Sequence, residues 1–140
     1  MNRHHHHDAD DELAKIPLFA GLGHKELEAV RRLLTEVTVA EGTVLTHEGG
    51  LGVEFFVIID GTASIERGGK HLGDVGPGEF QGEVSLLDGG PRTATVTATS
   101  PMTILVATSA EFASLLDAVP SIARQMLPAL AKRVRMAGNA

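Results

Sequence analysis

A long stretch of alternating polar and apolar residues, interrupted by glycines, runs from Glu36 to Thr108. A period of two is that of a β-strand whose alternate side chains face a core and solvent. Asp60-Gly61 and the glycine pair at 68–69 permit tight reversals between antiparallel strands. The predicted strands are Glu36–Val39, Thr43–Thr46, Phe55–Ile59, Thr62–Glu66, Lys70–Val75, Thr93–Ala98 and Thr103–Ala107. Short strands in this number favour a small barrel or jelly roll.

The segments on either side follow a helical period instead. Apolar residues recur every three or four positions between His24 and Leu34, which predicts an amphipathic helix. Ser109 is expected to cap a short second helix, with Glu111 in its first turn. A third helix is expected to begin near Pro120 and to carry an apolar stripe of Ile122, Met126, Leu130 and Val134. The sequence therefore predicts an α+β fold, an antiparallel β-barrel (jelly roll) flanked by N-terminal and C-terminal helices.

The length of 140 residues fits one domain, which we expect at residues 13–137 after a disordered tail at 1–12. The run His4–His7 in that tail is interpreted as a tag remnant or a solvated segment rather than a metal site. A net charge of −6 argues against direct binding to nucleic acid and against adhesion to anionic membranes. Cysteine, a secretory signal and an apolar stretch of membrane-spanning length are all absent, so a cytoplasmic location without membrane insertion is expected.

One segment inside the β-rich region, residues 77–96, departs from the alternating pattern. Residues 83–87 are long enough for about one helical turn, and Gly82 before them would let backbone amides approach a ligand. The unsatisfied amides of such a turn bind anions. Gly89-Gly90-Pro91 then reverses the chain so that Arg92 can face the same space, and a guanidinium pairs well with a phosphate. We therefore interpret the stretch from Gly78 to Thr95 as a phosphate-binding segment.

Gly-Glu-Val-Ser-Leu-Leu at 82–87, followed by Pro-Arg-Thr-Ala-Thr-Val at 91–96, resembles the phosphate-binding cassette of cyclic-nucleotide-binding domains. These domains are found in catabolite-activator proteins, kinase regulatory subunits and cyclic-nucleotide-gated channels. Ile16–Phe19 resembles the motif with which such a domain begins, and residues 41–45 and 55–61 resemble its early strands. The terminal helices fall where the family has its hinge and lid, so the resemblance covers nearly everything from Ile16 to Met136.

The resemblance implies a role for each matching residue. Glu83 would accept a hydrogen bond from the ribose 2′-hydroxyl, and Arg92 would pair with the cyclic phosphate. The remaining expected ligand-binding residues are Gly82, Val84 and Ser85 through their backbone amides, Thr93 beside phosphate and base, and Leu72, Phe80 and Val84 as pocket walls.

Two departures from the family pattern concern the base. Gln81 stands where the family often has an aromatic or apolar residue, and the last predicted helix carries no aromatic residue. Base contacts from that helix would then come from Leu130, Val134, Arg133 or Arg135. Thr93 is compatible with both cAMP and cGMP, and we favour cAMP.

These inferences predict a cyclic-nucleotide-binding sensor or regulatory domain that moves its C-terminal helices when cAMP or cGMP binds. Pro128 is expected to kink the last helix, either as a hinge for the lid or as a tolerated bend. The alternative is a ligand-free interaction or dimerisation module, with a homodimer formed through the C-terminal helix. The sequence contains no nucleophile–base pair, metal cluster or Walker motif, so we expect no catalytic residues, no metal, no cofactor and no enzymatic activity.

Overall fold

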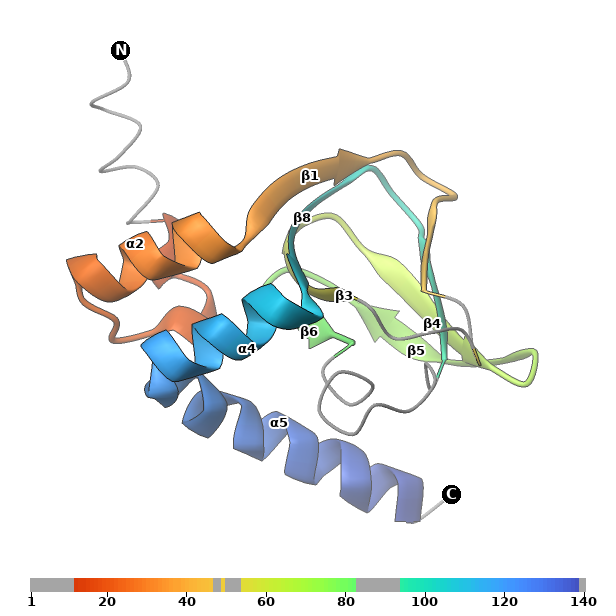
Figure 1. The fold of residues 1–140 in the computed structure, drawn as a ribbon. Helices are drawn as coiled ribbons and strands as arrows, with labels where there is room; N and C mark the ends of the chain where they lie inside the picture. Colours follow the sequence, from red (N-terminus) through yellow and green to blue (C-terminus); the bar gives the residue numbers. More distant parts are fainter. Residues whose placement is uncertain (1–11, 47–48, 50–53, 83–93, 139–140) are drawn as a thin grey trace.

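The computed structural model describes residues 12–46, 49, 54–82 and 94–138 (Figure 1). A short 3₁₀ helix, η1 (Pro17–Phe19), and helix α2 (His24–Leu33) precede the strands, and helices α4 (Ser109–Ala118) and α5 (Pro120–Gly138) follow them. The strands are β1 (Thr35–Val39), β2 (Val44–Thr46), β3 (Glu54–Asp60), β4 (Ala63–Arg67), β5 (Lys70–Val75), β6 (Phe80–Gln81), β7 (Thr95–Ala98) and β8 (Met102–Thr108). The predicted order of helix, β-region and two helices is confirmed. The boundary of the predicted tail at residues 1–12 stays a prediction.

The strands form two antiparallel sheets with the orders β1-β8-β3-β6 and β2-β7-β4-β5. This arrangement confirms the jelly roll, although within the described residues the two sheets are not joined into a closed barrel. A core of buried side chains fills the space between the sheets, because alternate residues of each strand point inward. Its members include Phe56, Ile58, Val75, Val96 and Ile104.

A second core lies on the other face of the sheet that contains β3, beneath the helices (Figure 1). Phe55 and Val57 belong to this core, whereas Phe56 and Ile58 belong to the core between the sheets. Strand β3 is therefore buried on both faces, which is why its sequence is an unbroken apolar run rather than an alternating one. The helices contribute Phe19, Val30, Phe112, Leu115 and Ile122.

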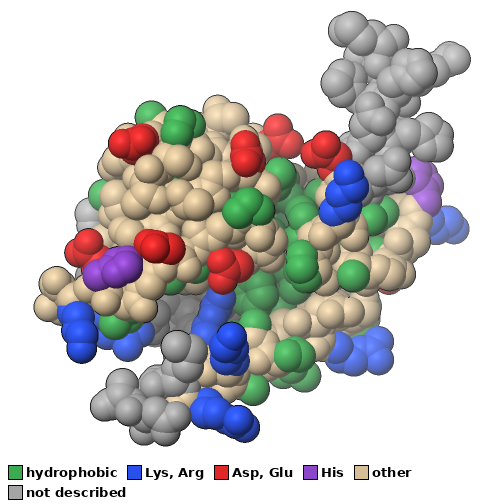
Figure 2. All heavy atoms as spheres, turned by 180° about the vertical axis from the view of Figure 1, so that it is seen from behind, with side chains coloured by type: hydrophobic (Ala, Val, Ile, Leu, Met, Phe, Trp, Pro, Cys, Tyr) green, Lys and Arg blue, Asp and Glu red, His purple; other side chains and the backbone are tan. Residues whose placement is uncertain are grey.

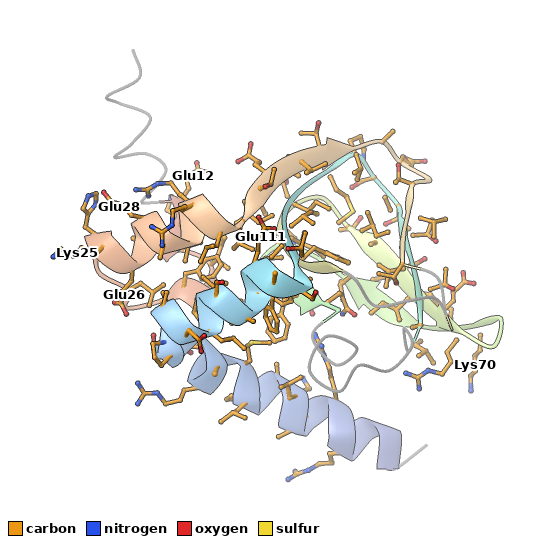
Figure 3. All side chains as sticks on the ribbon, viewed as in Figure 1. Glu12, Lys25, Glu26, Glu28, Lys70 and Glu111 are labelled. Atoms are coloured by element: carbon orange, nitrogen blue, oxygen red, sulfur yellow. The ribbon has the colours of Figure 1, made fainter. Side chains whose placement is uncertain are left out.

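Helix α2 confirms the amphipathic pattern of its sequence. Leu27 and Val30 are buried, while Lys25 and Glu28 lie on the exposed side of the helix (Figure 3). At the start of the helix, the carboxylate of Glu26 accepts a hydrogen bond from the amide of Gly23 at 3.1 Å, which satisfies one of the unpaired amides there.

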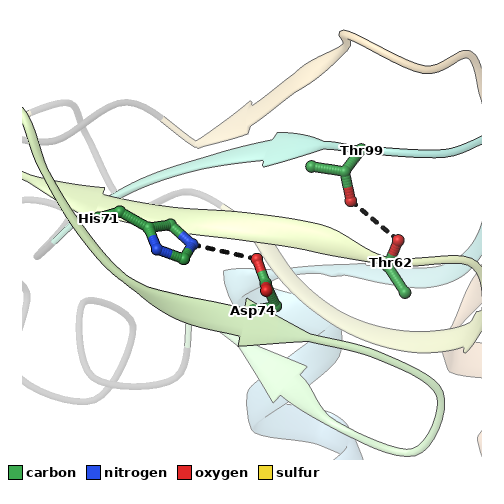
Figure 4. A network of polar contacts seen from close by, with 4 residues as sticks. All are labelled: Thr62, His71, Asp74 and Thr99. Atoms are coloured by element: carbon green, nitrogen blue, oxygen red, sulfur yellow. Dashed lines mark hydrogen bonds and ion pairs between the residues drawn. The ribbon is translucent and has the colours of Figure 1, made fainter.

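The turn between β3 and β4 lies against the turn between β7 and β8 (Figure 4). The hydroxyls of Thr62 and Thr99 are 2.8 Å apart, and the amide of Thr62 donates to Ser100 Oγ at 3.0 Å. Figure 4 also shows an exposed ring nitrogen of His71 3.1 Å from a carboxylate oxygen of Asp74 on β5. The predicted turn at Asp60-Gly61 is confirmed.

Two local predictions require correction. Strand β6 was not predicted, because two residues are too short to show a period; it exists through its pairing with Phe56 and Val57 of β3. The cap of α4 is Thr108 and not Ser109: Thr108 Oγ1 accepts from the amide of Glu111 at 3.2 Å, and the Glu111 carboxylate accepts from the Thr108 amide at 2.9 Å. Thr108 keeps the extended backbone of β8, so the helix begins at the next residue.

Among the described residues, no helix has both the length and the apolar character needed to cross a bilayer.

Candidate functional site

The predicted phosphate-binding segment begins where an edge strand of one sheet leads into an edge strand of the other, since β5 and β6 each end their sheet. In the turn between them, the Gly76 amide donates to a carboxylate oxygen of Glu79 at 2.6 Å. The Gly78 amide donates to the Ile58 carbonyl, and the Ile58 amide donates to the Glu79 carbonyl, both at 2.8 Å. A Cβ on Gly78 would lie 3.1 Å from a ring carbon of Pro17. The chain that enters the cassette is therefore fixed to β3 and packed against η1.

Phe80 connects this turn to the core beneath the helices. Its side chain is 5% exposed, and its ring centroid lies 6.0 Å from that of Phe55. Phe55 in turn lies 4.6 Å from the ring of Phe112 on α4. These tilted pairs have favourable aromatic geometry. The backbone of β6 is thus held from one side by β3 and from the other by an aromatic cluster that reaches α4.

Helix α5 reaches the same strand through Arg133. The Nη2 of Arg133 donates a hydrogen bond to the Phe80 carbonyl at 2.6 Å, and its guanidinium carbon lies 4.8 Å from the centroid of the Phe80 ring. Burial lowers the pKa of Arg133 below its ordinary value, and the negative charge of Glu79 offsets part of this effect by raising it. A charged hydrogen bond and a cation–π contact therefore link α5 to β6.

The described part of the predicted site contains Gly82, Phe80 and Leu72. Gly82 directly follows β6 with a φ of 96°, a conformation that favours glycine. Leu72 on β5 is 48% exposed, so much of its side chain is accessible to a ligand. Phe80 is 5% exposed, and its ring packs against Phe55 and the Arg133 guanidinium. The other predicted ligand-binding residues, Glu83, Val84, Ser85, Arg92 and Thr93, lie outside the described residues, as do His4–His7.

The base-contact candidates on α5 differ in their surroundings. Leu130 is half-buried against the core beneath the helices, and Arg135 is exposed. Arg133 contacts Phe80, a residue 53 positions earlier in the chain. Sequence reasoning named Arg133 only as a possible base contact and did not single out Glu79. The position of Glu79, directly after the Pro77-Gly78 turn, could have indicated that its carboxylate accepts a hydrogen bond from a backbone amide of that turn.

A cavity of about 300 Å³ lies elsewhere, between α2, β1, β3 and β8. Its lining is mostly apolar and includes Val30, Leu34, Ile59 and Leu105, with Arg31 and Glu36 among its charged members. Gly82, Phe80 and Leu72, the predicted ligand-binding residues that the structure describes, do not line this cavity. The cavity and the cassette strand β6 are therefore separate features of the domain.

The jelly roll, the flanking helices and the fixed strand before the cassette together define a cyclic-nucleotide-binding fold. Residues 36–119 match the sequence model of the family described as the cyclic nucleotide-binding domain. The chain belongs to the cyclic nucleotide-binding domain family. This result confirms the resemblance inferred from the cassette motif.

Three similar proteins illustrate the range of this family. A cyclic nucleotide-gated potassium channel of Mesorhizobium japonicum is 36% identical over 79% of this chain and 31% of the channel. The cyclic AMP receptor protein of Thermus thermophilus is 30% identical over 86% of this chain and 58% of that protein. The crystal structure of the N-terminal domain of a transcriptional regulator from Streptomyces coelicolor A3(2) is 36% identical, has a TM-score of 0.69, and aligns over 92% of this chain and 94% of that domain. This chain thus spans about a third of the channel and somewhat over half of the receptor protein.

Proposed function

We propose that this domain is a regulatory sensor that binds cAMP in preference to cGMP, without catalysing a reaction on it. The observation that carries the proposal is the cassette sequence, which begins at Gly82 immediately after the fixed strand β6. The cyclic AMP receptor protein among its relatives supports the choice of cAMP.

In the proposed site, Arg92 pairs with the cyclic phosphate and Glu83 accepts a hydrogen bond from the ribose 2′-hydroxyl. The amides of Gly82, Val84 and Ser85 surround the sugar and phosphate, and Thr93 lies beside phosphate and base. Leu72 and Phe80 form apolar walls. An arginine fork and backbone amides are strong partners for a phosphate, because hydrogen bonds to a charged group are shorter and stronger than neutral ones.

The charge of α5 supports the capture of an anionic ligand. The chain carries a net charge of −6, yet α5 contains no acidic residue and carries Arg124, Lys132, Arg133 and Arg135. Figure 2 shows basic side chains over α5, while acidic side chains lie mostly over the sheets. A local excess of positive charge raises the local concentration of an anion even on an acidic protein. We propose that binding shifts α4 and α5 between arrangements of different affinity.

Isothermal titration calorimetry with cAMP and cGMP tests this function. We expect the parent protein to bind cAMP more tightly than cGMP, and Arg92→Ala to weaken binding by about ten- to a hundredfold, because a charged hydrogen bond is worth about 1.5–3 kcal/mol. Arg124→Ala is the matched control, since Arg124 is exposed on α5 and has no proposed phosphate contact. Absence of heat with both nucleotides in the parent would contradict the sensor function.

The ribose contact has its own test. Glu83→Gln should reduce the preference for cAMP over 2′-deoxy-cAMP, because the neutral amide is a weaker acceptor for the 2′-hydroxyl. An unchanged preference would show that Glu83 does not contact the ribose.

A further inference from the structure

Helix α5 has two unequally anchored parts. Before Pro128, Ile122 and Met126 are 0% and 2% exposed and belong to the core beneath the helices. After Pro128, the side chains of Ala129 and Leu130 are only partly buried, and those of Ala131, Lys132 and Arg135 are exposed. Among the side chains that the structure describes, apolar burial therefore fixes the first part of the helix more firmly than the second.

Pro128 separates these two parts. Proline has no backbone N–H, so the hydrogen bond from position 128 to the carbonyl of Arg124 is missing from the helix. The segment beyond it, residues 129–138, is shorter than the about 12–15 residues that an isolated helix needs to be even marginally stable in water. This distal part of α5 therefore depends on tertiary contacts.

Arg133 provides such contacts at a rigid point of the β-region. Its guanidinium donates to the Phe80 carbonyl and lies over the Phe80 ring. Phe80 is itself fixed, because β6 pairs with β3 and the ring packs against Phe55. The nearby charge of Glu79 compensates part of the cost of burying the guanidinium.

We propose that Arg133 is a positioning residue that holds the distal part of α5 on strand β6 in the protein without nucleotide. Because β6 ends directly before the predicted cassette, the same contact ties the position of the helix to the strand that enters the site. An effect of Arg133 on nucleotide affinity would follow from this contact, and this part of the proposal rests on the proposed function. If the docked helix is the binding-competent arrangement, a smaller docked fraction lowers the apparent affinity in proportion.

Hydrogen exchange of the ligand-free protein tests the positioning role. In Arg133→Gln, we expect amides of residues 129–138 to exchange about ten- to a hundredfold faster, which corresponds to loss of a charged hydrogen bond. Amides of residues 122–127 and of β3 should be unchanged. Arg133→Lys keeps the charge over the ring but loses the planar fork, so it should restore part of the protection. Lys132→Gln is the control, because Lys132 is exposed on the same part of the helix and the substitution removes the same charge.

Two results would overturn the positioning role: unchanged exchange at residues 129–138 in Arg133→Gln, or an equal increase along the whole chain, which would mean that Arg133 stabilises the entire fold. Calorimetric titration with cAMP tests the effect on nucleotide affinity, with weaker binding expected for Arg133→Gln than for Lys132→Gln. Equal affinities would refute the coupling to the site. If the parent protein binds no nucleotide, the proposed function fails, while the exchange result still decides the positioning role.

Discussion

Gly61 illustrates how a single residue can be required by its backbone and by its neighbours together. Its φ is 92°, a region that side chains with a Cβ rarely adopt. A Cβ at this position would also collide with the carbonyl oxygen of Pro101 and lie 2.9 Å from the Cα of Met102. The reversal after β3 therefore needs glycine for two separate reasons.

We expect Gly61→Ala to lower the free energy of unfolding by about 2 kcal/mol or more, because backbone strain adds to a collision that only backbone movement can relieve. Gly69→Ala is the control, since Gly69 also has a positive φ, of 77°, but nothing lies within 4 Å of an added Cβ. Gly69→Ala should lower the free energy of unfolding by about 1 kcal/mol, through backbone strain alone. Urea denaturation measures both, and equal losses would refute the role of the collision.

At the scale of elements, the junction between β8 and α4 is defined by the reciprocal hydrogen bonds of Thr108 and Glu111. Figure 3 shows Glu111 at the start of α4. These bonds satisfy amides that the first helical turn leaves unpaired. They matter for the site because α4 carries Phe112, whose ring is linked through Phe55 to Phe80 on the strand that enters the cassette.

Thr108→Ala should lower the free energy of unfolding by about 1 kcal/mol, the usual cost of losing a capping side chain. Ser109→Ala provides the comparison, because Ser109 is exposed and is the first helical residue rather than the cap. Thermal unfolding followed by circular dichroism distinguishes the two variants. A larger loss in Ser109→Ala than in Thr108→Ala would overturn this assignment of the cap.

At the scale of the whole molecule, the two cores share strand β3. Phe55 and Val57 face the helices, and Phe56 and Ile58 face the other sheet. A change in either core therefore acts on a strand that supports both. The homodimer was predicted to form through the C-terminal helix. Ile122 and Met126 of the predicted apolar stripe are buried in the chain's own core, so they are not available to a second copy in this arrangement. The homodimer stays a prediction.

Because the two cores share a strand, we expect them to unfold together in one cooperative transition. Ile58→Ala should therefore lower the free energy of unfolding of the whole domain by about 2–5 kcal/mol. Val44→Ala is the control, since Val44 is 40% exposed on β2. Scanning calorimetry and circular dichroism at helical wavelengths should report the same lowered midpoint. If the circular dichroism signal of the helices in Ile58→Ala kept the midpoint of the parent protein, the two cores would unfold independently.

Sequence patterns were most informative where the energetics are local or repeated. The alternating period located most strands because it reflects which side chains face a core. The cassette motif resembles that of cyclic-nucleotide-binding domains, and the match of residues 36–119 to the family's sequence model confirms this resemblance. The boundary at Thr108 was missed by one residue, since Ser109 is an equally good capping residue type and only the backbone of β8 decides between them.

The sequence by itself determined the class of fold, the order of its elements and the motif of the proposed site. Only the tertiary structure decided that Phe80 and Gln81 form a strand and that Arg133 contacts Phe80. Both features depend on residues far apart in the chain: β6 exists through its hydrogen bonds to β3, and Arg133 lies 53 residues after its partner. No periodicity encodes such contacts, because their free energy arises only when the fold brings the two partners together.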